Sequence, residues 1–164
     1  MEERGAILMN RTLTALTVAA TMFANNAAAF DPDDLQKLKD TGNCVKCDLK
    51  GADLILANLK GAKLGGADLK GADLKGANLE GIYLMGANLE DASLSLANLE
   101  GANLKGANLE GIYLKDAIMK DAYLEDANLE RANLKGADLT GVYLKGAILC
   151  NTTMPDGSVI YRGC

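Results

Sequence analysis

A five-residue repeat runs through most of this chain and restricts its fold more than any other feature. Each unit reads Ala, then Asp or Asn, then Leu, then two variable residues, and 21 units follow one another without an insertion. The leucine position runs from Leu49 to Leu149 and is Leu in 20 units, with Met119 as the exception. The position two residues earlier is Ala in 17 units, and 13 units end in Gly. A repeat this strict indicates a solenoid of stacked coils.

A period of five is incompatible with a regular amphipathic helix or a regular strand. In a helix, leucines five residues apart would advance by about 140° per unit and spiral around the axis. In a strand, successive leucines would alternate between the two faces. We therefore expect the chain to turn a corner in every unit. Leu and Ala then point inward, and the frequent Gly supplies the backbone conformation of the corner.

The unit Ala-(Asp/Asn)-Leu-x-x, as in residues 57–61, 72–76 and 102–106, resembles the repeat of the pentapeptide repeat family. The resemblance covers residues 42–154. It implies an all-β fold, a right-handed, four-sided β-helix solenoid in which four units form one coil, so that the 21 units form about five coils. Cys44 and Met154 occupy leucine positions in degenerate units at the two ends of the register.

Residues 1–29 have the pattern of a secretory signal peptide. Arg4 and Arg11 supply positive charge, residues 12–24 form a short apolar run, and residues 27–29 are three alanines that resemble a cleavage signal. The apolar run is too short for a membrane span. We expect cleavage after residue 29, export and no membrane insertion of the mature form; a disordered or tagged leader is the alternative.

Caps are expected at both ends of the solenoid, in residues 30–41 and 155–164. Asp31 is a suitable N-cap and Pro32 a suitable first residue for a short helix over residues 30–41. Leu35 and Leu38 share a helix face that could cover the first coil, and Gly42 would end the helix. After residue 154, the sequence Pro-Asp-Gly favours a turn that folds the C-terminal segment over the last coil.

The four cysteines lie in pairs at the two ends of the repeat region. Because an oxidising compartment permits disulfides, we favour Cys44–Cys47 and Cys150–Cys164 as structural bridges. Inert core thiols are one alternative, and redox or metal chemistry at Cys44 and Cys47 is another. The chain has no histidine and no second nearby cysteine pair, which argues against zinc.

If four units form one coil, equivalent side chains of successive coils form columns on the outer surface. One column ends in three glutamates, Glu90, Glu110 and Glu130, and the neighbouring column carries lysines. Asn88, Asn108 and Asn128 fall in a column where amide ladders form. A solvated coat and local packing adjustment at the tyrosines are the alternatives to a binding surface. The candidate interaction residues are Lys75, Lys115, Lys135, Ile55, Leu56, Leu96, Tyr83, Tyr113, Tyr123 and Tyr143.

No catalytic centre or cofactor site is predicted. Histidine is absent, and the acids are spread over a convex surface rather than gathered in a cleft. Asp116, Asp121 and Asp126 fall at successive corners and point in different directions, so they do not predict a metal site.

Some pentapeptide repeat proteins imitate DNA and bind DNA gyrase, which is the alternative function that the resemblance implies. The basic column, the modest net charge of −5 and the expected export argue against this alternative. The resemblance is strongest to exported cyanobacterial members, through the Cys-x-x-Cys-Asp-Leu entry at residues 44–49 and the Met-Pro-Asp-Gly exit at residues 154–157. We therefore predict a non-catalytic, monomeric scaffold of the thylakoid lumen or periplasm. It would bind an unidentified protein partner and no nucleic acid.

Overall fold

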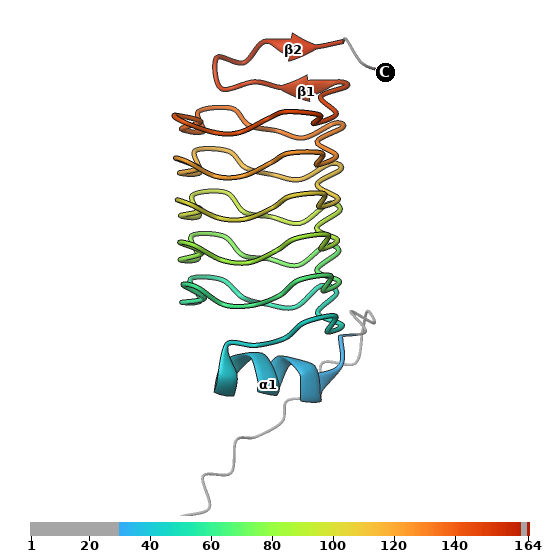
Figure 1. The fold of residues 1–164 in the computed structure, drawn as a ribbon, viewed down its shortest axis with the longest axis vertical. Helices are drawn as coiled ribbons and strands as arrows, with labels where there is room; N and C mark the ends of the chain where they lie inside the picture. The colour runs from blue at the N-terminus through green and yellow to red at the C-terminus, as the bar shows by residue number, and fades with distance from the viewer. Residues whose placement is uncertain (1–29, 162–163) are drawn as a thin grey trace, which may run out of the picture.

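The computed structural model describes residues 30–161 and 164, which form a rod of stacked coils (Figure 1). Helix α1 (Pro32–Thr41) lies across one end, and strands β1 (Thr152–Thr153) and β2 (Val159–Ile160) lie at the other. The predicted signal peptide, residues 1–29, lies outside the described residues. Within the described part of the chain, no helix is both long and apolar enough to span a membrane.

Each coil contains four units, because every residue that precedes a leucine pairs with the equivalent residue four units later. These parallel bridges continue from Asn43↔Lys63 to Asn133↔Thr153. In a typical rung, Leu49 N–H donates to Asp68 O at 2.8 Å and Asp68 N–H donates to Cys47 O at 2.9 Å. The repeat therefore stacks in register, with one unit on each of four sides.

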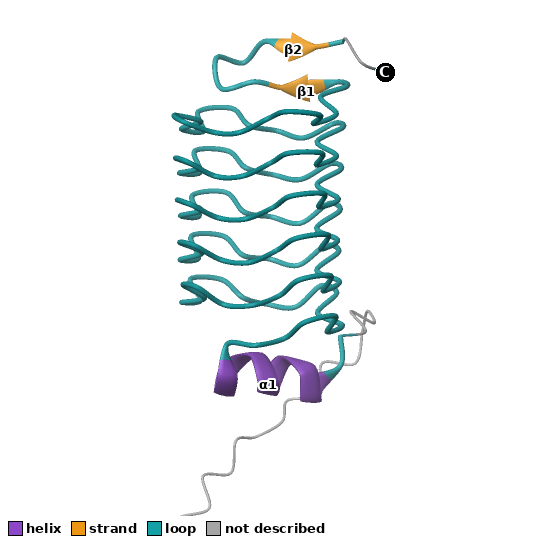
Figure 2. Cartoon of the chain, in the orientation of Figure 1, coloured by secondary structure: helices purple, strands orange, loops and turns teal. Residues whose placement is uncertain are grey.

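The sides of the coils are short bridges rather than long strands, so most of the rod is drawn as loop (Figure 2). A turn closes every unit, as where Ala52 N–H donates to Leu49 O at 3.1 Å. The residue before that alanine, Gly51, has a φ of 61°. This left-handed conformation is easy for glycine, which explains the Gly-rich fifth position. With two residues of every unit in the turn, little extended backbone remains.

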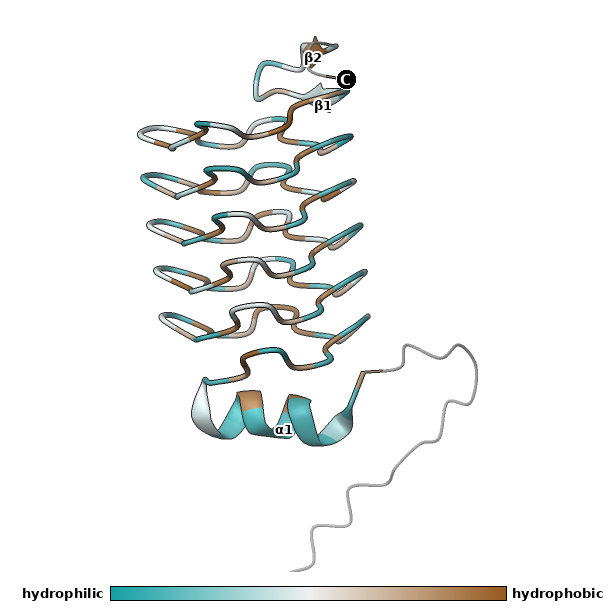
Figure 3. Ribbon diagram, turned by 45° about the vertical axis from the view of Figure 1, so that its right-hand side comes forward, coloured by the Kyte–Doolittle hydropathy of each residue, from teal (hydrophilic) through white to brown (hydrophobic). Residues whose placement is uncertain are grey.

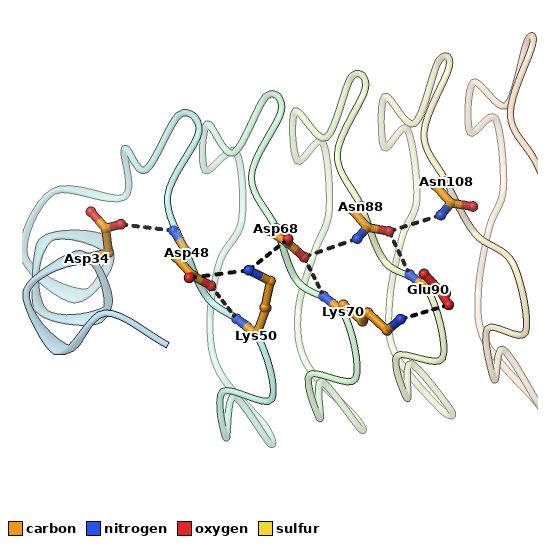
Figure 4. A network of polar contacts seen from close by, with 8 residues as sticks. All are labelled: Asp34, Asp48, Lys50, Asp68, Lys70, Asn88, Glu90 and Asn108. Carbon is orange, nitrogen blue, oxygen red and sulfur yellow. Dashed lines mark hydrogen bonds and ion pairs between the residues drawn. The ribbon is translucent and has the colours of Figure 1, made fainter. Parts of the chain in front are cut away.

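Leucine and alanine fill the interior, as the register predicts. Apolar and polar residues alternate along each coil (Figure 3), and the inward residues of the central coils are almost fully buried, from Ala87 at 0% exposed to Leu134 at 1%. Outside the core, Asn128 donates to Asn108 at 3.4 Å and Asn108 donates to Asn88 at 3.0 Å. The predicted amide ladder is thus confirmed, and it continues to Asp68 (Figure 4).

Helix α1 is fixed to the first coil by both packing and polar contacts. Asp31 caps the helix by accepting a hydrogen bond from Asp33 N–H at 2.9 Å, and Gly42 ends it with a φ of 63°. Leu38 is buried, and Asp34 accepts a hydrogen bond from Asp48 N–H at 2.9 Å. The helix therefore continues the core and satisfies part of the first coil's backbone.

The C-terminal segment covers less of the last coil than the sequence predicts. β1 pairs antiparallel with β2, and Met154 N–H donates to Ser158 O at 2.7 Å. A disulfide from Cys164 returns the chain to Cys150. A hairpin closed in this way is too short to cross the end of the rod. Three inward leucines of the last coil are consequently only partly buried: Leu139, Leu144 and Leu149.

Candidate interaction face

The register of four units per coil places most of the predicted interaction residues on one side of the rod, here called the lysine face. Consecutive bridges, Asp53↔Asp73, Asp73↔Ser93, Ser93↔Tyr113 and Tyr113↔Asn133, define this side. It comprises residues 53–56, 73–76, 93–96, 113–116 and 133–136. The predicted residues on it are Lys75, Lys115, Lys135, Ile55, Leu56, Leu96 and Tyr113.

Two leucines on the lysine face occupy corner positions with an exposed side chain. Leu56 has a φ of 56° and is 75% exposed; Leu96 has a φ of 63° and is 57% exposed. The left-handed conformation itself belongs to the repeat, since the fifth residue of every unit adopts it. What distinguishes these two corners is a large apolar side chain that lies in solvent, where a partner could cover it.

A hollow of about 320 Å³ lies in the middle of the lysine face. It forms where the unit at residues 92–96 carries serine on both sides of its leucine, because Ser93 and Ser95 are smaller than most residues at those positions. Lys75 and Lys115 line the hollow one coil before and one coil after Ser95. Two ammonium groups beside two hydroxyls can bind a carboxylate or another anion. The Asp116 carboxylate also lines the hollow and pairs with Lys115 at 3.9 Å, so among the described residues Lys75 is the cation without a partner there.

The lysines of this face are poorly neutralised. Among the described residues, Lys75 and Lys135 form no salt bridge, and Lys115 has only Asp116, at 3.9 Å. The face therefore combines lysines that are weakly paired or unpaired with the exposed apolar residues Ile55 and Leu56. Its net charge is zero, because it also carries three aspartates, Asp53, Asp73 and Asp116.

The neighbouring column, predicted to be an acidic stripe, is largely neutralised by ion pairs. Lys70 binds Glu90 at 2.9 Å (Figure 4), and Arg131 pairs with Glu110. Hydrogen bonds to carboxylates raise the pKa of both lysines in this column, that of Lys50 chiefly through Asp68 and that of Lys70 chiefly through Glu90. The stripe is consequently a less distinctive surface than the charge pattern alone predicts.

The predicted tyrosines divide between two opposite sides of the rod. Tyr83, Tyr123 and Tyr143 lie on the side opposite the lysine face, and Tyr113 lies on the lysine face. Tyr123 and Tyr143 stack, with ring centroids 5.0 Å apart. Asn103 separates Tyr83 from Tyr123 in the bridge ladder. The tyrosines therefore do not form one continuous stripe.

The cysteines are joined in two disulfides, Cys44–Cys47 and Cys150–Cys164. In the described residues, one group has the spacing of a metal site: Asp34, Cys44 and Cys47, whose ligand atoms lie within 4.8 Å. Both sulfurs of this group are bonded to each other, and a metal needs thiolates. These residues therefore serve as a staple beside α1 rather than as a metal centre.

Sequence reasoning missed the hollow and did not group three of its residues, Ser93, Ser95 and Asp116, into one site. A signal was present, since residues 92–96 form the one unit with serine on both sides of its leucine. Lys75 and Lys115 occupy the same position as Ser95 in the coils before and after it, so the column register places all three side by side.

The stacked register and the corner turns agree with a match to a family model. The model for pentapeptide repeats, in eight copies, matches residues 43–81, 52–91, 82–121 and 117–154. The chain belongs to the pentapeptide repeat family. Proteins of this family form right-handed, four-sided β-helices. No sequence among the curated proteins matches this chain.

Several solved pentapeptide repeat structures are similar to this chain. Rfr23 from the cyanobacterium Cyanothece 51142 is 29% identical, with 70% of this chain and 92% of that chain covered and a TM-score of 0.47. A thylakoid lumen protein from Arabidopsis thaliana is 34% identical, with coverages of 63% and 70% and a TM-score of 0.24. QnrB1, a plasmid-mediated fluoroquinolone resistance protein, is 20% identical, with coverages of 61% and 58% and a TM-score of 0.47.

Proposed function

We propose that this pentapeptide repeat protein is an exported, non-catalytic scaffold that binds an acidic segment of a protein partner through the lysine face. The observation that carries the proposal is the hollow between Lys75 and Lys115, with the exposed leucines Leu56 and Leu96 on the same face. An acidic side chain would enter the hollow, and apolar residues next to it would contact Leu56 and Leu96. Complementary charge steers such partners and fixes their register.

Two observations support an oxidising compartment. The two disulfides would be unusual in a reducing cytosol, and residues 1–29 have the sequence pattern of a signal peptide. Together with the resemblance to exported cyanobacterial members, they lead us to place the protein in the thylakoid lumen or the periplasm. The absence of histidine and the convex surface of the rod support a role in binding rather than in catalysis.

A charge reversal with a matched control tests this proposal. The variant Lys75→Glu/Lys115→Glu/Lys135→Glu reverses the lysine face. Lys63→Glu/Lys105→Glu/Lys145→Glu makes the same change in net charge on the opposite side. Proteins retained from a lumenal or periplasmic fraction would be identified, and the affinity of each purified partner measured at two salt concentrations.

We expect a partner that the control variant retains and that the lysine-face variant binds at least about tenfold more weakly. Added salt should weaken binding to the wild type and the control alike. Equal retention by all three proteins would contradict the proposal, as would a partner lost only from the control.

A further inference from the structure

Helix α1 covers only half of the N-terminal end of the rod. On the covered half, the Thr41 hydroxyl accepts from Asn43 N–H at 3.0 Å, and its one hydrogen is shared between Lys37 O, at 2.7 Å, and Asn43 O, at 3.2 Å. Asp48 N–H donates to the Asp34 carboxylate at 2.9 Å, and Asp48 O accepts from Asp31 N–H at 3.0 Å. The backbone of these two sides of the first coil is therefore satisfied.

The other two sides of the first coil have no such cover. Within residues 30–161, the backbone N–H and C=O groups of Asp53 and Asn58 have no protein partner. One coil later, the equivalent groups of Asp73 are both bonded, its N–H to Ala52 O at 3.0 Å and its C=O to Leu54 N–H at 2.8 Å. Residues 53–60, here called the open half-edge, thus present the donors and acceptors of a rung without the strand that would complete it.

A cavity of about 460 Å³ lies between α1 and the open half-edge. Leu38 of the helix and the coil residues Leu54, Ala57 and Leu59 form its apolar lining, and Lys60 is at its rim. This volume falls within the range of ordinary ligand pockets. The apolar interior of the rod is accessible through this cavity at the N-terminal end, as it is at the other end around Leu139, Leu144 and Leu149.

We infer that the open half-edge binds a peptide segment of a protein partner that turns one corner as a repeat unit does, with one aliphatic side chain in the cavity. The two residues on either side of that corner offer the N–H and C=O groups that Asp53 and Asn58 lack as partners, as when a peptide adds to a sheet edge. The charges around the cavity select no charged neighbour for the aliphatic side chain, because Lys60 pairs with Glu80 at 2.9 Å and Asp53 lines the cavity together with Lys39.

A second copy of the rod does not fit this edge. Stacked coils must approach to about 4.8 Å to form hydrogen bonds, whereas α1 on the other half of the same end is about 10 Å thick. The helix would therefore hold another rod beyond bonding distance. A single peptide segment can lie beside the helix. This inference goes beyond the proposed function, since it uses none of Lys75, Lys115 and Lys135.

The probe for this site is a blocked peptide of two repeat units, acetyl-GANLKGANLE-amide, which has the sequence of residues 101–110. A scrambled peptide of the same composition is its control. We expect saturable binding of the repeat peptide to the full chain. Hydrogen exchange of the Asp53 and Asn58 amides should slow by about tenfold on binding, and exchange of the Asp73 amide should not change.

Two matched substitutions locate the binding. Ala57→Leu fills the cavity, and Ala147→Leu adds the same bulk at an equally inward, partly buried position of the last coil. Circular dichroism checks that both variants keep the fold. We expect Ala57→Leu to weaken binding by about tenfold, and Ala147→Leu and the lysine-face reversal to leave it unchanged.

Four results would overturn the inference: no saturable binding, equal binding of the scrambled peptide, full binding by Ala57→Leu, or Asp53 and Asn58 amides that are already protected in the free chain. The last result would mean that a segment of this chain occupies the edge. Binding of the repeat peptide is measured for the lysine-face variant as well. A failure of this site can therefore be distinguished from a failure of the proposed function.

Discussion

Corner residues influence which residue can occupy the corner one coil later. At four corners an Asp in left-handed conformation directs its carboxylate toward the glycine at the same corner of the next coil, where a Cβ would overlap it. These glycines thus serve two purposes, since they adopt a positive φ and leave space for a side chain. The four pairs are Asp91 with Gly111, Asp116 with Gly136, Asp121 with Gly141 and Asp126 with Gly146.

Two alanine substitutions separate these purposes. Gly136 and Gly106 both have positive φ, but only Gly136 faces a carboxylate, that of Asp116. Each substitution should lower the free energy of unfolding by about 1–2 kcal/mol through backbone strain. Gly136→Ala should cost about 0.5–1.5 kcal/mol more, because Asp116 must leave its rotamer. Urea unfolding measures the difference, and equal costs would show that the space above Asp116 is unimportant.

The asparagine ladder has a matched control within the same coil. Asn108 and Asn103 each accept a hydrogen bond from the backbone N–H two residues later, but only Asn108 also bonds asparagines of the adjacent coils. Asn108→Ala should therefore destabilise the rod by about 1–2 kcal/mol more than Asn103→Ala, since two inter-coil bonds are lost. Thermal unfolding of both variants is the test; a larger loss for Asn103→Ala would contradict the structural role of the ladder.

At the scale of elements, α1 could be predicted and the C-terminal hairpin could not. Asp31, Pro32 and Gly42 carry capping preferences that act within a few residues, and the helix begins and ends beside them. β1 and β2 have two residues each, too few to show a period. The sequence predicts the turn after residue 154 and the Cys150–Cys164 disulfide, but neither feature specifies that β1 pairs with β2.

Helix α1 should stabilise the adjacent coil far more than the distant ones. Leu38→Ala removes a buried side chain and should cost about 2–5 kcal/mol locally. In a stack with contacts only between neighbours, the effect should fade along the rod. Hydrogen exchange should accelerate at the Cys44 and Leu49 amides and stay unchanged at Leu114. Uniform acceleration would instead indicate that the whole rod unfolds as one unit.

The disulfide at the other end should act on the hairpin. Cys164→Ala opens a loop whose closing residues are 14 apart in sequence, which should remove about 3 kcal/mol of stabilisation from this end. Limited proteolysis should then cleave between Pro155 and Tyr161 before any site in the coils. A cleavage rate equal to that of the wild type would show that β1–β2 pairing alone holds the segment.

At the scale of the whole molecule, the repeat predicts the register and the inward residues, and both are confirmed. The column arrangement predicts the surface charges less well, because ion pairs also join residues of different columns. Lys50, for example, binds Asp68 of the next coil at 3.2 Å, and Asp68 belongs to a different column. The open half-edge could not be predicted either. It depends on where α1 lies on the first coil, which the Asp34 contact with Asp48 N–H fixes.

Side-specific crosslinking tests the central claim, that one side of the rod binds the partner. A photoreactive phenylalanine analogue would replace Ser95 in the hollow of the lysine face or, in a matched protein, Lys105 on the opposite side. Irradiation in the native compartment should yield one defined adduct from position 95 and none from position 105. Adducts from position 105 alone, or the same adducts from both positions, would contradict the account.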